Sequence, residues 1–414
     1  MLVNITDYKE YSKQGADWTE SFQRAVEDIK KAGGGTLQVD SGVYQTAGIR
    51  LTSNMTLYLE EGSVISFTDD FERYPVIRGS FEGVFCDMYQ PFIYAKDEAS
   101  VSVEGKGRIT GNGQKWWRAL LDGKLEIIRP RLLYFENCSE VLIKDVTLTD
   151  SPCWTVHPYW CDHVSVIGIK IKNPADSPNT DGIDPDSCRD VLIKDCTIDV
   201  GDDCIAIKSG VEQNDHLRAC EDIVIEGCYM VHGHGGVVLG SESSGGIRNV
   251  TVRDCVFEDT DRGIRYKTRR RRGGVVTDID FEHIRMKNVM CPFVFNMFYF
   301  CGKLGREPWV SDPAPAPVDK GTPSLSDIKI HNVHVEDARS CAGIFAGLPE
   351  QKISGITFKD CTVSMKQGAE PEIPAMMSGL DPMSAAGFVF KNVEHVTFEN
   401  VDTKNVIGEN MVSL

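Results

Sequence analysis

The sequence lacks several features that would mark a membrane or nucleic-acid-binding protein. No stretch approaches the roughly 18 consecutive apolar residues of a membrane span, and Met1 is not followed by an apolar leader with a small-residue cleavage site. Positive charge is also scarce, because 44 basic against 61 acidic residues give a net charge of −17. Electrostatics therefore give no reason to expect a nucleic-acid or anionic-membrane partner, and we expect a soluble, cytoplasmic protein.

The dominant feature of the sequence is a repeated pattern, here called the phrase. It consists of two short runs in which apolar and polar residues alternate, with a polar pair between the runs. The phrase starts at Val141, Val164, Val191, Ile223, Val250, Ile279, Ile328, Ile356 and Val396, at spacings of 23 to 49 residues. Period-two alternation predicts strands, and a repeat in the twenties predicts a solenoid. A leucine-rich solenoid is the nearest alternative, but β-branched residues dominate here. The sequence thus predicts an all-β, single-domain parallel β-helix over residues 1–414.

Details of the repeat support this interpretation. Polar pairs such as Lys144-Asp145, Lys194-Asp195 and His331-Asn332 suit tight bends between sheets. The 14 cysteines are scattered without a paired Cys-x-x-Cys metal pattern. Four of them share one place in the repeat, namely Cys196, Cys228, Cys255 and Cys361. We expect buried free thiols that stack inside the solenoid.

Three segments depart from the repeat. Residues 17–32 form a helix candidate, which Asp17 or Thr19 can cap, with Phe22, Ala25, Val26 and Ile29 on one face. Such a helix would cover the open end of the solenoid. Residues 113–130, with Trp116 and Trp117, and residues 302–323, with five prolines, are predicted loop insertions. Either insertion could form a binding wall or be structural filler.

Polar motifs concentrate in four successive repeats in the middle of the chain. They are 179–184 with Asp181, 201–203 with Asp202 and Asp203, 233–236 with His234, and 265–267 with Arg265 and Lys267. Asp202 and His234 each lie 11 residues after the start of their phrase, and Asp181 precedes Asp202 by about one coil. Since adjacent coils are about 4.8 Å apart, we expect these side chains to meet. Crowded carboxylates have pKa values that are pushed apart, which suits the acid and base of glycoside hydrolysis.

These four motifs, in this order, resemble glycoside hydrolase family 28, the polygalacturonase family. The similarity is closest over residues 177–210 and extends through residues 235–246. The resemblance implies a right-handed parallel β-helix and inverting hydrolysis without a metal or other cofactor. It implies an acidic, galacturonate-containing oligosaccharide as the substrate.

The resemblance also implies roles for individual residues. Asp202 would be the general acid, Asp181 with Asp203 would hold and deprotonate the attacking water, and His234 would support the acid. Arg265 and Lys267 would bind the substrate carboxylate, since guanidinium and ammonium groups can engage one carboxylate together. Tyr266 would take an inward or sideways strand position without altering the chemistry. Further candidates to contact the sugars are Tyr299, Asn179, Trp154, His157 and Glu242. Trp154 and His157 could instead cover the core, and Glu242 could be a solvated turn residue.

Several functions remain open at this point. The preferred hypothesis is exo-cleavage of α-1,4-galacturonosyl linkages in pectin-derived oligogalacturonides, since a protein without a leader would meet short imported chains. Hydrolysis of rhamnogalacturonan oligosaccharides is the main alternative, followed by a calcium-dependent lyase of the pectate lyase type and a non-catalytic glycan-binding β-helix. The run Arg269 to Arg272 could concentrate positive charge at the site or form a solvated turn. The oligomeric state is not specified by the sequence.

Overall fold

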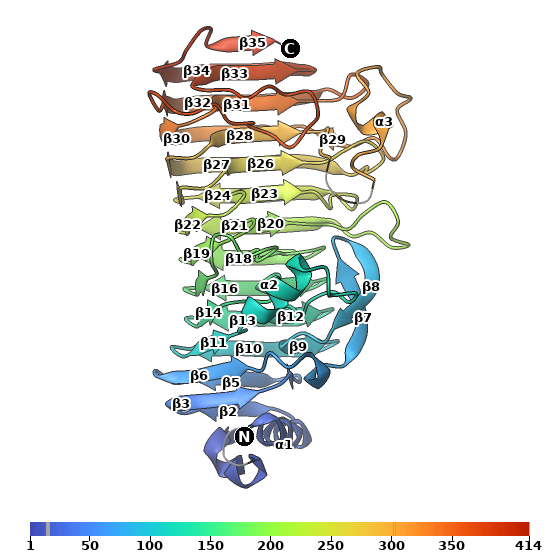
Figure 1. Ribbon diagram of the computed structural model, residues 1–414, viewed down its shortest axis with the longest axis vertical. Helices are drawn as coiled ribbons and strands as arrows, with labels where there is room; N and C mark the ends of the chain where they lie inside the picture. The colour runs from blue at the N-terminus through green and yellow to red at the C-terminus, as the bar shows by residue number, and fades with distance from the viewer. Residues whose placement is uncertain (14–16, 301, 303, 414) are drawn as a thin grey trace. The chain divides into compact units, whose positions relative to one another are not determined.

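The computed structural model describes residues 1–13, 17–300, 302 and 304–413. Contacts divide the chain into two compact units, Met1–Asp202 and Asp203–Leu414, and each is described by itself. Strands dominate both units, and their pairings are parallel except in one hairpin (Figure 1). The single domain over 1–414 stays a prediction.

The first unit stacks its strands into three parallel columns, to which successive coils add one strand each. The first column contains β1 (Leu2–Asn4), β2 (Gly35–Val39), β5 (Met55–Leu59), β10 (Ala99–Gly105), β13 (Ser139–Lys144), β16 (Asp162–Ile167) and β18 (Arg189–Lys194). The second contains β3 (Gly42–Thr46), β6 (Ser63–Phe67), β11 (Arg108–Thr110), β14 (Thr147–Thr149), β17 (Lys170–Lys172) and β19 (Thr197–Val200). The third contains β4 (Ile49–Arg50), β9 (Ile93–Lys96), β12 (Leu133–Glu136) and β15 (Val156–Tyr159).

The N-terminal end of this unit carries the 3-10 helix η1 (Ile5–Tyr11) and the helix α1 (Thr19–Lys31). Phe22, Ala25 and Ile29 are buried on one face of α1, as the sequence predicts, while Val26 is partly exposed. The helix packs against β2, β3 and β4, which confirms the predicted cap. It begins after Trp18, and the Asp17 carboxylate accepts from the Thr19 amide at 3.0 Å.

Two elements of the first unit lie outside the columns (Figure 1). The first is an antiparallel hairpin of β7 (Val76–Phe81) and β8 (Val84–Tyr89), which follows the short η2 (Phe71–Arg73). The second is α2 (Gln114–Leu121), so the prediction of a loop over 113–130 is wrong for these residues. The helix forms because Trp116 and Trp117 can both be buried on one face, with Trp116 stacked 3.8 Å from the Phe71 ring. Trp116 is therefore structural filler.

The second unit repeats the same architecture. One column contains β21 (Cys220–Glu226), β24 (Ile247–Arg253), β27 (Val275–Lys287), β30 (Ile328–Ala338), β32 (Ile353–Met365) and β34 (Val393–Lys404). Three shorter strands adjoin this column, namely β22 (Tyr229–His232), β25 (Val256–Glu258) and β29 (Ser324–Leu325). Strand β22 pairs with β25, and both β25 and β29 pair with β27. The other column contains β20 (Ile205–Ile207), β23 (Val237–Gly240), β26 (Arg262–Lys267), β28 (Cys291–Asn296), β31 (Cys341–Ala346), β33 (Ala386–Lys391) and β35 (Met411–Ser413).

The predicted insertion over residues 302–323 separates β28 from β29, although Lys303 lies outside the described residues. It contains a short helix, α3 (Pro308–Ser311), so the prediction of a loop is wrong for this turn. Pro308 occupies the first turn of α3, where its missing amide hydrogen costs no hydrogen bond.

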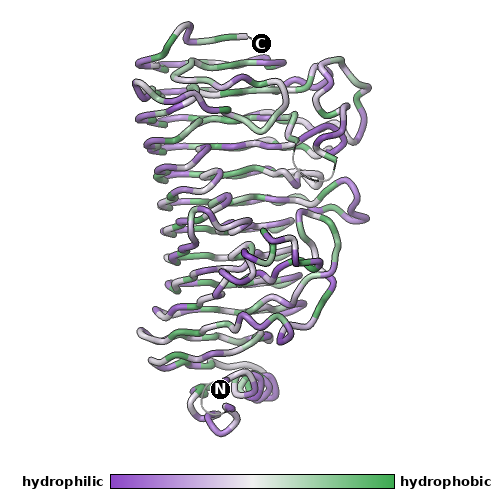
Figure 2. The backbone as a smooth tube through the Cα atoms, viewed as in Figure 1, coloured by the Kyte–Doolittle hydropathy of each residue, from purple (hydrophilic) through white to green (hydrophobic). Residues whose placement is uncertain are grey.

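The repeated phrase accounts for the core and the bends. Apolar and polar residues alternate along the strands (Figure 2), and the inward positions are buried. Asp145, Asp195 and Asn332 have φ angles of 62°, 53° and 53°, the left-handed turn conformation that short polar side chains tolerate. The four aligned cysteines are buried free thiols, as predicted, and Cys228 adjoins Cys255 on the next coil. None of the described helices is long and apolar enough to span a membrane.

Candidate active site

Two acidic side chains of the first unit lie close together. Carboxylate oxygens of Asp181 and Asp202 are within 4.8 Å of one another. Asp181 is only 3% exposed, whereas Asp202 is half-buried. Carboxylates at this separation repel unless one holds a proton or a cation lies near them. The pair could supply oxygen ligands to a metal, and it could equally divide the roles of acid and base.

The backbone around Asp181 is fixed by the preceding coil. The Thr155 amide donates to the carbonyl oxygen of Asp181 at 2.9 Å. Two residues later, Ile183 forms a parallel bridge with Val156. The pairing continues the third column of the first unit beyond β15, so Asp181 stands at the edge of a rigid sheet.

Arg129 fixes the segment that leads to Asp181. Its guanidinium donates to the carbonyl oxygens of Pro152 and Pro178 at 2.7 and 2.8 Å and to Oδ1 of Asn179 at 2.6 Å. Asn179 therefore has a structural partner, which leaves its predicted contact with a sugar as a prediction. Sequence reasoning missed Arg129, because two of its three partners are backbone carbonyls and no motif reveals them.

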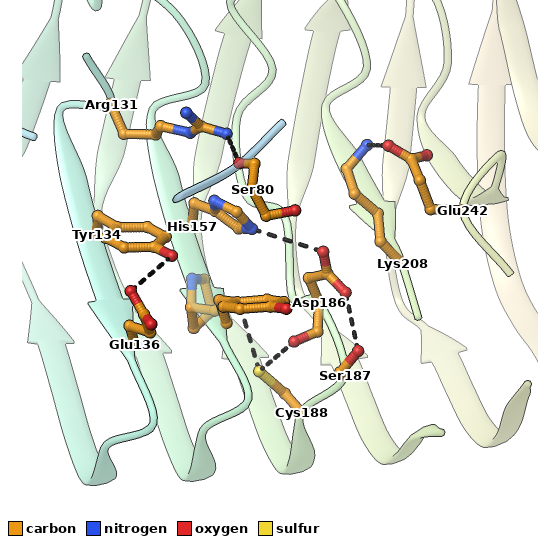
Figure 3. Close-up of polar contacts among 12 residues, drawn as sticks. Ser80, Arg131, Tyr134, Glu136, His157, Asp186, Ser187, Cys188, Lys208 and Glu242 are labelled. Carbon is orange, nitrogen blue, oxygen red and sulfur yellow. Dashed lines mark hydrogen bonds and ion pairs between the residues drawn. The ribbon is translucent and has the colours of Figure 1, made fainter. Parts of the chain in front are cut away.

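An aromatic cluster supports this edge of the sheet, and Figure 3 shows two of its members, Tyr134 and His157. Trp154 and His157 meet edge to face at 4.9 Å, and Tyr134 lies 5.1 Å from the His157 ring. His157 is fully buried, with Nε2 3.8 Å from the Asp186 carboxylate. Trp154 is nearly as buried, so both residues cover the core in this structure, and their predicted contact with a sugar stays a prediction.

Register places three of these side chains in one row. Val156 pairs with Leu133 on one side and with Ile183 on the other. Arg131, Trp154 and Asp181 each precede the paired residue by two positions, so they occupy equivalent places on three successive coils. Coils are about 4.8 Å apart, which puts Arg131 roughly 10 Å along the row from the acid pair.

The tip of the β7–β8 hairpin covers this row. Phe81 lies against Trp154 with the two rings tilted by 31° and their centroids 5.1 Å apart. Arg131 donates to the Ser80 carbonyl oxygen (Figure 3). Arg131 is fully buried, and its guanidinium lies 4.9 Å from the Trp154 ring centroid. The hairpin is thus anchored over the coil next to Asp181. Sequence analysis missed it, because a short antiparallel pair does not follow the repeat.

The second unit opens with Asp203, which is fully buried between two cations. Lys267 Nζ lies 2.6 Å from one carboxylate oxygen and Arg265 Nη1 lies 3.2 Å from the other. Burial alone would raise the pKa of Asp203, but the charges of Lys267, Arg265 and Lys208 outweigh it and hold that pKa far below its usual value. Asp203 is accordingly a fixed anion, and both predicted substrate-binding cations already bind it.

The negative charge of Asp203 in turn shifts the pKa of Lys267. Burial alone would lower its pKa, but the Asp203 carboxylate outweighs this effect and holds the pKa of Lys267 above its usual value. The Tyr299 ring stands over both cations, with its centroid 5.6 Å from Arg265 Cζ and 5.5 Å from Lys267 Nζ. Tyr266, between the two cations in the chain, is fully buried, as the sequence predicts.

His234 lies on the coil after Asp203. It is exposed, and it directly precedes Gly235, whose carbonyl oxygen accepts from the Cys204 amide at 2.8 Å. A side chain at Gly235 would meet Asp203 Oδ1 at 3.2 Å and Val238 Cγ2 at 2.5 Å. Glycine is therefore required for the backbone to approach the buried carboxylate so closely.

Glu242 pairs with Lys208 at 3.8 Å (Figure 3). Glu242 is buried, so the alternative of a solvated turn residue is wrong. Burial alone would raise its pKa, but the charges of Lys208, Arg272 and Lys267 outweigh it and leave the pKa below the usual value. The glutamate is thus an anion within a group of cations.

The arginine run continues this group. Arg269 and Arg272 are buried and lie 2.6 and 3.2 Å from the two carboxylate oxygens of Glu212. Arg270 is also buried and binds both oxygens of Glu350, at 2.5 and 2.8 Å. A solvated turn is therefore the wrong interpretation for these three arginines.

This charge cluster is defined by Lys208, Arg265, Lys267, Arg269, Arg270, Arg271 and Arg272 with Asp203, Glu212, Glu242 and Glu350. Seven cations against four anions leave three positive charges on a chain whose net charge is −17. The second unit therefore carries a local positive field suited to an anionic ligand.

The chain thus combines parallel β-helix architecture with a close carboxylate pair in the first unit and a group of cations in the second, as a protein that acts on acidic carbohydrates would require. Comparison with known proteins also points to an enzyme family that acts on carbohydrates. The family "Glycosyl hydrolases family 28" matches residues 81–378, and the chain belongs to this family.

Individual relatives extend the match. A protein named "Probable polygalacturonase" from Vitis vinifera is 33% identical over 88% of this chain and 76% of its own length. An endo-polygalacturonase of Pectobacterium carotovorum is 28% identical over 68% of this chain and 72% of its own. Three other plant relatives are matched over only 45% or 46% of their lengths.

Among solved structures, an exopolygalacturonase of Thermotoga maritima has a TM-score of 0.81 at 27% identity, with 98% of this chain and 92% of that one covered. The predicted fold class, a right-handed parallel β-helix, is confirmed.

Proposed function

We propose that the protein is an inverting, exo-acting hydrolase of α-1,4-galacturonosyl linkages in oligogalacturonides. The observation that carries this proposal is the pair of carboxylates, Asp181 and Asp202, on a chain of a glycoside hydrolase family. Hydrolysis of a glycosidic bond needs one carboxylic acid to protonate the leaving oxygen and one carboxylate to activate water.

The environments of the three aspartates favour a division of roles. Asp202 is the more exposed member of the pair, so its proton can reach a leaving oxygen, and we assign it as the general acid. Asp181 is nearly enclosed and would hold the water. Asp203 stays ionised because Lys267 and Arg265 neutralise it, and it would assist Asp181 in orienting and deprotonating that water. His234 would support the acid.

The charge cluster supports a uronic acid as the sugar. Its excess of cations lies around Arg265 and Lys267, whose guanidinium and ammonium groups can bind a substrate carboxylate. Names of the relatives point the same way, since those from Vitis vinifera and Pectobacterium carotovorum are polygalacturonases. Turnover of homogalacturonan and rhamnogalacturonan oligosaccharides side by side tests this choice, and faster release from the rhamnogalacturonan chain would contradict it. A cytoplasmic location stays part of the proposal.

Inversion predicts the anomer of the first product. The separation of up to 4.8 Å between oxygens of Asp181 and Asp202 is shorter than the roughly 6.5–9.5 Å usual between the carboxyl groups of inverting enzymes. Inversion therefore rests on family membership. Proton NMR during the first minutes of hydrolysis should show the β-anomer of galacturonate before mutarotation. An initial α-anomer would exclude inversion.

Two observations support exo-action. The structural relative from Thermotoga maritima is an exopolygalacturonase. In this chain, the β7–β8 hairpin covers Trp154 and Arg131, one and two coils from Asp181. A polymer that lay across Asp181 and continued along this row would meet Phe81, so a chain end is the part of the substrate that fits.

Exo-action from the non-reducing end predicts a simple product pattern. Digestion of an oligogalacturonide labelled at its reduced end should give labelled products that shorten by single steps from the start. Chromatography of early time points checks this, and labelled products of intermediate length at the outset would contradict exo-action.

A further inference from the structure

Arg271 differs from the three other arginines of its run. Arg269, Arg270 and Arg272 are buried and paired with Glu212 or Glu350. Arg271 is exposed. Within the described part of the chain, no hydrogen bond or acidic partner engages its guanidinium.

The backbone conformation of Arg271 is unusual for this residue type. The Arg272 amide donates to the Arg269 carbonyl oxygen at 3.2 Å, which closes a tight turn with Arg271 at its third position. The φ angle of Arg271 is 65°, a region that glycine or asparagine prefers at such a place. Arginine there costs about 1 kcal/mol or more, so the turn itself does not favour this residue.

The guanidinium of Arg271 packs against the indole ring of Trp309. Arg271 Cζ lies 4.2 Å from the Trp309 ring centroid, and Arg269 Cζ lies 5.5 Å from it. Trp309 belongs to α3 in the 302–323 insertion and is partly exposed. Arg270 holds the insertion in place, because it donates to the carbonyl oxygens of Trp309 and Asp312 at 2.9 and 2.7 Å.

We propose that Arg271 and Trp309 form an additional uronate-binding subsite, which holds a sugar of the substrate chain away from the cleaved bond. This proposal rests on the proposed function and adds a specific place for a second carboxylate. An indole face packs against the C–H face of a pyranose ring, and a guanidinium forms paired hydrogen bonds with a carboxylate. Together the two groups match a galacturonate residue better than a neutral sugar.

The position of the pair suits a chain of several sugars. Arg271 follows Lys267 by four residues, which limits their backbone separation to about 14 Å. An oligogalacturonide with one carboxylate near Lys267 can thus place another near Arg271. A disaccharide places both of its sugars beside the cleaved bond, so neither of them is left for a subsite away from it.

Chain-length dependence tests the subsite. For Arg271→Gln, KM for tetragalacturonate should rise about tenfold, the size expected for loss of one charge-assisted hydrogen bond at a partly exposed site. KM for digalacturonate and kcat for both substrates should not change. Arg306→Gln is the matched control, because Arg306 is an exposed arginine of the same insertion that lies 6.0 Å from the Phe300 ring centroid. An equal change for both substrates, or no change for tetragalacturonate, would overturn the proposal.

A binding measurement separates this proposal from the proposed function. Calorimetry on Asp202→Asn, with and without Arg271→Gln, should show weaker binding of tetragalacturonate when Arg271 is lost. Methyl-esterified tetragalacturonate should bind both proteins equally, since its carboxylates are neutral. Loss of the Arg271 effect on the free acid would reject the subsite even if turnover is normal. If no galacturonide is turned over, the hydrolase assignment fails, while the calorimetry still decides the subsite.

Discussion

Replacement of Asp202 by Asn should reduce kcat on oligogalacturonides by about 10³-fold, near the middle of the range for loss of a general acid. The amide has the same shape but no proton that it can transfer to a leaving oxygen. Asp202 is half-buried and asparagine has nearly the same volume, so the change should leave the fold intact. Steady-state rates with reducing-sugar detection measure the effect.

Two controls separate loss of the acid from general damage. Asp195→Asn changes an exposed aspartate in a turn with φ 53°, where asparagine is equally suited, and should have normal activity. A nitrophenyl galacturonide, whose leaving group departs without a proton, should be hydrolysed by Asp202→Asn much more nearly at the wild-type rate. Near-normal turnover of oligogalacturonides by Asp202→Asn would remove this residue from the role of acid.

Replacement of Lys267 by Met should lower the free energy of unfolding by about 3–5 kcal/mol, the usual cost of removing one partner from a buried ion pair. Asp203 is fully buried and would keep Arg265, 3.2 Å away, as a cation beside its carboxylate. Methionine fills a similar volume, so the effect reports the loss of one of the cations that neutralise the Asp203 carboxylate. Denaturant unfolding of the full chain at neutral pH measures it.

The double variant Lys267→Met with Asp203→Asn provides the comparison. It removes both charges of the pair but also takes from the buried Arg265 its carboxylate partner, so it should recover only part of the stability lost in Lys267→Met. If the single variant is as stable as the wild type, the pair does not contribute in the way its geometry implies.

The pH dependence of this pair has a definite sign. The folded-state pKa of Asp203 lies below its unfolded value, so its contribution to stability is present above about pH 4, the unfolded pKa. It is lost as the pH falls through the folded pKa. The folded-state pKa of Lys267 is raised, so its contribution is fully present below about pH 10 and is lost above it. The stability difference between wild type and Lys267→Met should therefore be constant from about pH 5 to 9 and shrink in strong acid.

Much of the fold could be predicted because it is periodic. Each coil repeats the same alternation, and the Asn and Asp residues of the bends mark its length, so the strands and turns follow from local rules. The hairpin of β7 and β8 and the helix α2 could not be predicted from the repeat. Each is a single departure from it, and their packing depends on contacts such as Phe81 with Trp154 and Trp116 with Phe71, which join distant parts of the sequence.

The candidate site was predictable to a similar degree. Asp181 and Asp202 could be brought together by counting residues per coil, because solenoid geometry converts spacing into position. The partners of Asp203 could not be found in this way. Counting residues per coil does not show that Arg265 and Lys267, which are predicted to bind the substrate carboxylate, also bind the buried carboxylate of Asp203. The ion pairs of Arg269, Arg270 and Arg272 were equally hidden, because Glu212 and Glu350 lie 57 to 80 residues away.

The β7–β8 hairpin is held on the coils mainly by side-chain contacts and adds no strand to their columns. Its two strands pair with each other, and their other backbone pairing among the described strands is an isolated bridge from Met88 to Ile128. Insertions or deletions at its tip would therefore leave the alignment of every column unchanged. This hairpin is the natural place to exchange segments between homologues when the aim is to alter the length of the released fragments without redesigning the scaffold.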